Sequence, residues 1–294
     1  MPEQDVVSTS AHVRRPGHQF AWPGGRKVAV VFNLAFERWS DGKAPPLGPM
    51  GNPLPAGTFD TNALSWGAFG SVRGIDRLLR ILDRQAVRAS VMTSGAFAES
   101  APATVRRIAE EGHEIVAHAW AQDVIPARLS VEDVRLDIQK TTDALVSASG
   151  KPVRGWISPR GTPHAESARF LLEAGYQWQG DVFDDDRPYI QDFDKGSLAA
   201  IPLTMEVNDL PHAMRYGRSP RQFVELFDDT LRAALALDEP MVLDVTVHCH
   251  CYGHAGGAYA FETIARLAKE RDDIWIARRD DIATHLLETL DSRK

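Results

Sequence analysis

Residues 244–254, DVTVHCHCYGH, end an apolar run with three histidines and two cysteines. Imidazoles exchange protons near neutral pH and bind metal ions, so this segment is the first candidate for chemistry. If the chain stays extended, its side chains alternate between two faces. This places His248 and His250 on one face and Cys249 and Cys251 on the other. We expect the histidines to face a site and the cysteines to pack as small core residues.

Three further apolar runs also end in side chains that could take part in chemistry. These side chains are Glu37 and Arg38 after KVAVVFNLAF, His118 and Trp120 in HEIVAHAW, and Trp156 and Arg160 in VRGWISPRG. A carboxylate can act as a general base, an imidazole as a general acid, and a guanidinium as a support for negative charge. If the runs are strands whose ends meet, the set suits acid–base chemistry on a small polar substrate.

The elements that must position these residues alternate along the chain. We expect strands at 27–36, 88–93, HEIVAHAW, VRGWISP, AAIPLT, MVLDVTVH and IWIAR. We expect helices near 72–85, near 102–111, from Ser130, over HAESARFLLEAG, from Ser219 to about Leu237, near 258–270 and near 280–290. This alternation predicts an α/β fold with a parallel sheet. A series of about seven or eight such units favours a closed barrel, whose chemistry lies at the carboxyl ends of its strands.

Two segments are left without an assigned role. The connection over 41–70 is rich in proline and glycine and has no periodicity. Loops of this length are usually functional or mobile, so it could cover a pocket or bridge two subunits. The stretch EVNDLPH (206–212) follows a strand, and Asn208 or Asp209 could line the pocket.

Composition excludes several classes of protein. The chain has 294 residues, 44% hydrophobic and 25% charged, and a net charge of −7. These values are typical of a soluble globular protein without a nucleic-acid surface. The amino terminus lacks the apolar core of a secretory signal, and no apolar run is as long as a membrane span. We therefore expect a cytoplasmic protein with free thiols and with neither nucleic acid nor a membrane as a partner.

Several segments, in this order, resemble the polysaccharide deacetylase family. They are WPGGRKVAVVFNLAFE, SWGAFGSVRGIDRLLRIL, EEGHEIVAHAW, VRGWISPRGTP, and VTVHCHCYGH followed by DDIWIARRDDIATH. The resemblance implies one catalytic domain over 1–294, with 1–20 as an N-terminal arm. It also implies a deformed (β/α)7-8 barrel that hydrolyses amide bonds, assembled as a homo-oligomer (dimer or tetramer). The branch it is most similar to contains allantoinase-like and cyclic-imide-hydrolase-like enzymes, which act on small amides.

The resemblance assigns roles to individual residues and exposes two departures from the family pattern. The family's first motif has two adjacent acids, a general base followed by a metal ligand, and here they are Glu37 and Arg38. Its second motif offers two histidines four residues apart as further ligands, and here they are His118 and Gln122. Two of the family's three metal ligands are therefore absent.

The third and last motifs of the family correspond to Arg160 and His248. We therefore predict Glu37, His248 and Arg160 as catalytic residues. Glu37 would activate a water, His248 would protonate the leaving nitrogen, and Arg38, Arg160 or the backbone would stabilise the oxyanion. The predicted substrate-binding residues are Arg38, His118, Trp120, Trp156 and His250. The predicted function is hydrolysis of a carbon–nitrogen bond, other than a peptide bond, in a small amide, cyclic ureide or imide, without a metal cofactor.

Three alternatives stay open. Zinc or another divalent metal could bind a set drawn from His118, His248 and His250. The chain could be a metal-dependent carbohydrate N-deacetylase, which would link it to carbohydrate metabolism. It could also be a non-catalytic binding protein on a decayed deacetylase scaffold, because an arginine in a metal-ligand position is what such decay would leave.

Overall fold

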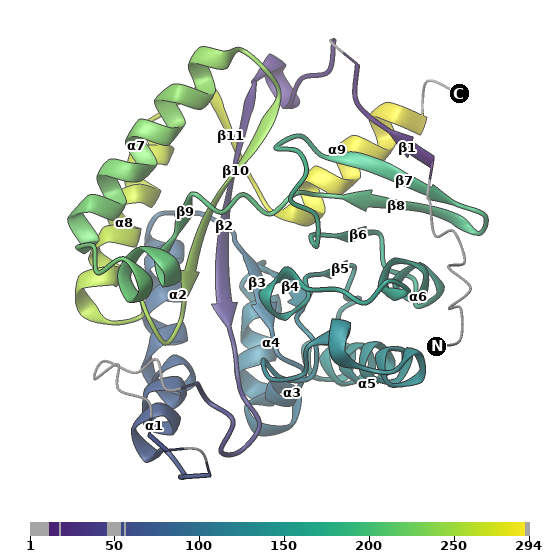
Figure 1. Cartoon of the computed structure of the whole chain (residues 1–294). Coiled ribbons are helices and arrows are strands. Elements are labelled where there is room, and N and C mark those ends of the chain that lie inside the picture. Colours follow the sequence, from purple (N-terminus) through teal and green to yellow (C-terminus); the bar gives the residue numbers. More distant parts are fainter. Residues whose placement is uncertain (1–11, 18, 46–53, 56, 292–294) are drawn as a thin grey trace.

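The computed structural model describes residues 12–17, 19–45, 54–55 and 57–291. Its strands are β1 (His12–Arg14), β2 (Val28–Phe36), β3 (Ser90–Thr93), β4 (Glu114–Ala117), β5 (Gly155–Trp156), β6 (Trp178–Gln179), β7 (Tyr189–Phe193), β8 (Gly196–Ala200), β9 (Val207–Asn208), β10 (Met241–His248) and β11 (Ile274–Ala277). They form one sheet in the order β1-β7-β8-β6-β5-β4-β3-β2-β10-β9, and β11 pairs with β2 (Figure 1).

Helices follow most of the strands. The α-helices are α1 (Thr61–Phe69), α2 (Ile75–Arg84), α3 (Ala96–Ser100), α4 (Pro102–Glu110), α5 (Val131–Ser149), α6 (Ser167–Glu173), α7 (Pro220–Leu237), α8 (Ala255–Lys269) and α9 (Arg279–Asp291). The shorter turns are η1 (Pro23–Gly25), the π-helix η2 (Gly70–Gly74), η3 (Pro126–Arg128), η4 (Pro159–Gly161) and the π-helix η5 (Leu210–Arg215). As predicted, α5 and α7 begin at side-chain caps, Ser130 and Ser219. None of the helices in the described part of the chain is long and apolar enough to cross a membrane.

The predicted α/β fold with a parallel sheet is confirmed, but the predicted closure of the barrel is wrong. Pairing is parallel from β8 through β6 and β2 to β9, whereas β1 and β7 pair antiparallel at one edge. Among the described residues, β1 and β9 end the sheet without pairing to each other. Because β5, β6 and β9 have only two residues each, they form few of the inter-strand hydrogen bonds that would close the sheet into a barrel. The result is a deformed, open barrel.

The 41–70 connection is not structureless throughout, which corrects that expectation. Its last third forms α1, which Asp60 caps by accepting a hydrogen bond from the backbone of Ala63. The chain continues through η2 directly into α2. Residues 46–53 and 56 of the connection, and residues 1–11 and 18 of the predicted N-terminal arm, lie outside the described residues.

Strand alternation separates the two faces of the sheet. Even-numbered side chains of β2 join the large cluster packed with the helices, whereas its odd-numbered apolar side chains join the inner cluster with α9. Glu37 continues the odd-numbered series one residue beyond β2. In β10 the odd-numbered side chains face the helices instead. Val247 and, just after the strand, Cys249 pack in the helix-facing cluster, so His248 faces inward. Both cysteines are free and buried, as predicted.

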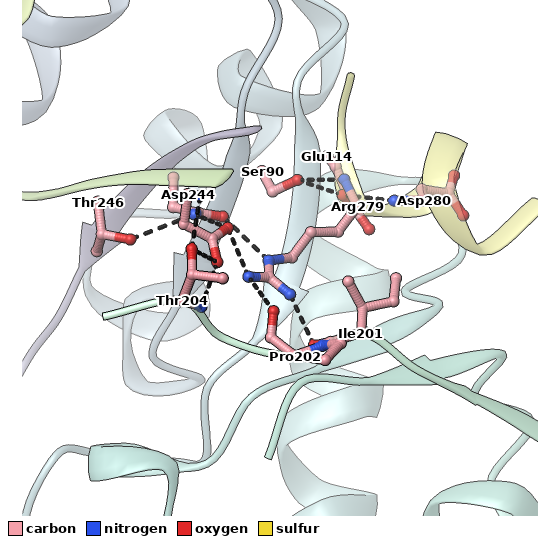
Figure 2. A network of polar contacts seen from close by, with 10 residues as sticks. Ser90, Glu114, Ile201, Pro202, Thr204, Asp244, Thr246, Arg279 and Asp280 are labelled. Carbon is pink, nitrogen blue, oxygen red and sulfur yellow. Dashed lines mark hydrogen bonds and ion pairs between the residues drawn. The ribbon is translucent and has the colours of Figure 1, made fainter. Parts of the chain in front are cut away.

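A buried ion pair fixes the interior behind the strand ends. Arg279 Nη2 lies 2.6 Å from Asp244 Oδ1, and both side chains are fully buried. Arg279 also donates to the carbonyls of Ile201 and Pro202, at 3.0 and 3.3 Å (Figure 2). Asp244 accepts from the backbone N–H of Thr204 at 2.8 Å. These contacts satisfy the buried charges and tie β10, whose last residue is His248, to α9 and to the segment after β8.

Candidate active site

Three strand ends bring Glu37, His118 and His248 together. Glu37 directly follows β2, His118 directly follows β4, and His248 is the last residue of β10. Glu37 Oε1 lies 3.4 Å from His118 Nε2 and 3.6 Å from His248 Nε2. All three side chains are buried. One carboxylate oxygen thus faces two imidazole nitrogens at the carboxyl ends of three parallel strands.

Asp209 orients His248 and stabilises its charge. The carboxylate accepts from His248 twice, from Nδ1 at 2.6 Å and from the backbone N–H at 2.9 Å. It also accepts from the backbone N–H of Tyr252 at 3.1 Å and is fully buried. Burial alone would lower the pKa of His248, but the charges of Glu37 and Asp209 raise it to about 9. His248 is therefore a cation at neutral pH whose Nε2–H points toward Glu37.

Glu37 is held as an anion. Burial works to raise its pKa, but the charge of His248 and the hydrogen bond from His118 outweigh burial and lower it to about 2. At neutral pH the pair is a deprotonated carboxylate facing a protonated imidazole. These are the protonation states that a general base and a general acid require.

His118 is fixed from behind by a backbone carbonyl. Its Nδ1 lies 2.5 Å from the carbonyl oxygen of Ile157, so this nitrogen carries a proton. Nε2 is thereby aimed at Glu37. The following residue, Ala119, has the left-handed φ of 51°, which turns the chain away directly after the strand end.

His250 lies beside this cluster, but in the turn that follows β10 and not on an extended strand as expected. Its ring centroid is 5.6 Å from that of His248. The rings of Trp39 and Trp66 meet it edge to face, at 5.1 and 4.6 Å. Both ring nitrogens are buried and have no hydrogen-bond partner among the described residues. Burial, together with the charge of His248, lowers its pKa to about 4, so His250 is neutral at physiological pH.

The two predicted arginines do not meet the carboxylate, which corrects their assignment. In the described part of the chain, the ion pairs of Glu37 are with histidines. The guanidinium of Arg38 lies 3.7 Å from Asp41 at the surface, because one step along an extended chain reverses the direction of the side chain. Arg160 is exposed in η4 with a left-handed backbone, φ 60° and ψ 14°. Among the described residues, neither guanidinium forms an ion pair with Glu37.

The two predicted tryptophans also face away from the cluster. Lys140 Nζ of α5 lies 3.3 Å from the ring centroid of Trp120. Trp156 is buried in the helix-facing cluster and donates from Nε1 to Ser158 at 3.0 Å. Strand alternation explains this orientation, since the neighbouring Ile157 belongs to the inner cluster. Both residues pack against the helix layer, and their part in substrate binding stays a prediction.

The residues at the family's cation-binding positions do not fit a divalent metal ion. Of Arg38, His118 and Gln122, His118 alone offers a typical ligand atom. The amide Nε2 of Gln122 is buried without a hydrogen-bond partner among the described residues, and it is a donor rather than a ligand. Within the ranges that the structure describes, no three histidine, cysteine, aspartate or glutamate side chains come together as a metal-binding group.

Sequence reasoning missed three residues of this site. Asp209 was considered for the pocket but was not assigned, and Trp39 and Trp66 were not considered. Burial could have pointed to Asp209, because an aspartate between Asn208 and an apolar LP pair needs a partner if it is enclosed. A cavity of about 490 Å³ lies elsewhere, between α6 and the β7–β8 hairpin, and is lined by none of the residues of the cluster.

Comparison with known proteins points to one family and one fold. The family model for polysaccharide deacetylase matches residues 50–178. A Schizosaccharomyces pombe protein assigned as a polysaccharide deacetylase is 23% identical over 298 residues, covering 89% of this chain and 91% of its own. The crystal structure of a probable polysaccharide deacetylase from Pseudomonas aeruginosa PAO1 is 25% identical, with a TM-score of 0.82 and coverage of 93% and 95%. That of Puue allantoinase is 23% identical, with a TM-score of 0.82 and coverage of 98% of both chains.

The two solved structures share the fold of this chain over nearly its whole length. These matches confirm the predicted class of enzyme, a hydrolase of carbon–nitrogen bonds other than peptide bonds. The chain thus matches the polysaccharide deacetylase family model over residues 50–178 and is similar to proteins described as polysaccharide deacetylases over most of its length.

Proposed function

We propose that this enzyme hydrolyses a small amide, cyclic ureide or imide and that it does so without a bound metal ion. The observation that carries the proposal is the charged pair of Glu37 and His248 at 3.6 Å, with Asp209 behind the imidazole. The substrate class follows from the family resemblance and from the fold shared with Puue allantoinase. The cytoplasmic location and the homo-oligomeric state stay predictions.

The proposed reaction uses the two groups in the protonation states in which they rest. Glu37 takes a proton from a water molecule, and the water oxygen bonds to the carbonyl carbon. His248 then gives its Nε2 proton to the leaving nitrogen as the carbon–nitrogen bond breaks. A separation of 3.6 Å lets the two groups act on adjacent atoms of one bond. Proton transfers by positioned groups of this kind contribute about 10²–10⁴-fold each to the rate.

His118 takes the role of stabilising the oxyanion, which the sequence analysis assigned to Arg38, Arg160 or the backbone. Because the Ile157 carbonyl fixes Nδ1, Nε2 is directed at the region of Glu37 where the carbonyl oxygen would lie. With protons on both ring nitrogens, His118 would donate from Nδ1 to Ile157 and from Nε2 to the developing oxyanion, which the second hydrogen bond would stabilise. No step of this mechanism passes through a cation, in keeping with the side chains at positions 38 and 122.

The test is turnover of a panel of succinimide, hydantoin, allantoin and a chitooligosaccharide by the purified protein. Glu37→Gln keeps the shape of the side chain and removes the base, so kcat should fall by about 10³-fold. Arg38→Gln is the matched control, since that side chain faces Asp41, and it should retain activity. Full activity of Glu37→Gln would discard the mechanism.

The same panel separates the alternatives. Release of acetate from the chitooligosaccharide, with no turnover of the cyclic compounds, would favour a carbohydrate N-deacetylase. Thermal shifts with every bound compound but no product would favour a binding protein on this scaffold. Ring opening of a cyclic amide by the wild type, lost in Glu37→Gln, is the result that we expect.

A further inference from the structure

His250 carries an unexplained energetic cost. The side chain is 1% exposed, and both ring nitrogens lack a hydrogen-bond partner in the described part of the chain. A buried polar group left unpaired costs about 1–3 kcal/mol, so native structures rarely keep one without a reason. The mechanism above does not use His250. Its ring nevertheless lies 5.6 Å from that of the general acid His248.

Two tryptophans and a π-helix hold His250 in this position. The indoles of Trp39 and Trp66 meet the imidazole at interplanar angles of 79° and 84°. Gly70 and Gly74 of η2 press against the backbone of residues 249 and 250, where a Cβ on Gly74 would overlap the carbonyl of Cys249. π-helices often occur at functional sites. Trp39 and the α1–η2 segment with Trp66 therefore enclose the imidazole of His250. We call Trp39, Trp66 and His250 the aromatic box.

We propose that His250, Trp39 and Trp66 form the subsite that binds a neutral, planar amide group of a small substrate. This inference rests on the proposed function and names the part of the site that recognises the substrate. The subsite selects substrates by chemical class and by size. His250 acts here as a specificity residue, while Glu37 and His248 carry out the bond cleavage.

The chemistry of a neutral imidazole selects the amide. One ring nitrogen donates a hydrogen bond and the other accepts one, so the ligand must offer both an acceptor and a donor. The C=O and N–H of an amide or imide provide this pair. His250 is neutral because burial lowers its pKa to about 4. It therefore offers no positive charge to an anion, and the carboxylate of Glu37 nearby repels one.

Enclosure selects for size. Trp66 is 7% exposed, and α1 lies over the imidazole through the contact of the two rings at 4.6 Å. A polymer would need an open groove across the strand ends, whereas a small flat ring can be held between aromatic walls. Small cyclic amides therefore fit this subsite better than a glycan chain does.

The test measures binding in a protein that cannot turn over. The parent protein carries Glu37→Gln, and two double variants carry His250→Phe or His250→Gln in addition. The Kd of succinimide and of hydantoin is measured by calorimetry for all three proteins. Loss of both hydrogen bonds in His250→Phe should weaken binding about tenfold, whereas His250→Gln, which keeps a donor and an acceptor, should stay within about threefold. His254→Phe is the matched control, since this exposed ring stacks on Phe69 at 3.7 Å and lies outside the box.

A second readout distinguishes recognition from a structural role. Because His250 makes no hydrogen bond that its replacement would break, the Tm of His250→Phe should be equal to or above that of the parent. Unchanged Kd values, or failure of the parent to bind any neutral cyclic amide, would overturn the subsite. Binding that depends on His250 without turnover by the wild type would refute the proposed function and leave the subsite standing.

Discussion

The substitution Asp209→Asn tests whether the charge of Asp209 keeps the proposed general acid, His248, protonated. The amide has the same shape and can still accept from the backbone N–H groups of His248 and Tyr252, which lie 2.9 and 3.1 Å from Oδ2. What it removes is the negative charge beside Nδ1. The fold should therefore be retained while the imidazolium is destabilised.

The magnitude follows from the pKa of His248. With a pKa of about 9, the imidazole is about 90% protonated at pH 8. If the pKa returned to the ordinary histidine value of 6.5, only about 3% would be protonated, a loss of about thirtyfold. Glu37 retains part of the shift, whereas the loss of the orienting carboxylate adds to the effect. We expect kcat/KM at pH 8 to fall by about 10²-fold.

The assay is the dependence of kcat/KM on pH between 6 and 10, with the best substrate of the panel. The wild type should lose activity as the pH rises through about 9, where His248 loses its proton. Asp209→Asn should lose activity at a lower pH. Asp123→Asn is the matched control, because this carboxylate caps the backbone of Ser40 at 2.7 Å and does not contact His248. An unmoved basic limb in Asp209→Asn would refute the reasoning.

Two further predictions concern stability. Glu37, whose pKa falls from 4.5 to about 2, stabilises the fold above pH 4.5, and this contribution is lost as the pH falls through 2. His248, whose pKa rises from 6.5 to about 9, stabilises the fold below pH 6.5, and this contribution is lost as the pH rises through 9. Urea unfolding should therefore show a loss on the order of 3 kcal/mol between pH 5.5 and pH 9.5, and His248→Gln should abolish most of that difference. Arg279→Leu should cost about 3–5 kcal/mol in the free energy of unfolding because it leaves Asp244 buried and unpaired. Arg271→Leu, which removes a partly exposed ion pair, should cost less than about 1 kcal/mol, and equal losses for the two variants would contradict the role given to burial.

The strand periodicity predicted the centre of the site well. The two-residue alternation placed His248 on the inner face and Cys249 toward the helices, and the structure agrees, whereas His250 lies in the turn after β10. The same rule, applied to the residues after β2, would have turned Arg38 away from Glu37. The family motif drew attention to position 38 instead, although local geometry was the better guide there.

Features that depend on irregular backbone could not be predicted. Asp209 reaches His248 from a two-residue strand followed by a π-helix, and neither has a periodic pattern in the sequence. Arg160 itself has a left-handed backbone, with φ 60°. Since residues other than glycine rarely adopt this conformation, the sequence does not predict it. The closure of the barrel was overestimated because the pattern of alternating elements does not reveal how short β5 and β6 are.

The same limit applied to the 41–70 connection. Its proline and glycine content gave no sign of α1. This helix has no amphipathic stripe and packs mainly through the buried side chain of Trp66. Tertiary contact with His250 gives this helix its place. A residue that caps the site was therefore found by the structure alone.

The central claim is that Glu37 and His248 hydrolyse the carbon–nitrogen bond without a cation. The most direct measurement is turnover of a cyclic amide before and after dialysis against a chelator, with the metal content determined on the same sample. We predict unchanged turnover and less than about one metal ion for every ten chains, which is too little metal to account for the activity of the sample. Stoichiometric zinc, together with turnover that is abolished by the chelator and restored by zinc, would contradict the account.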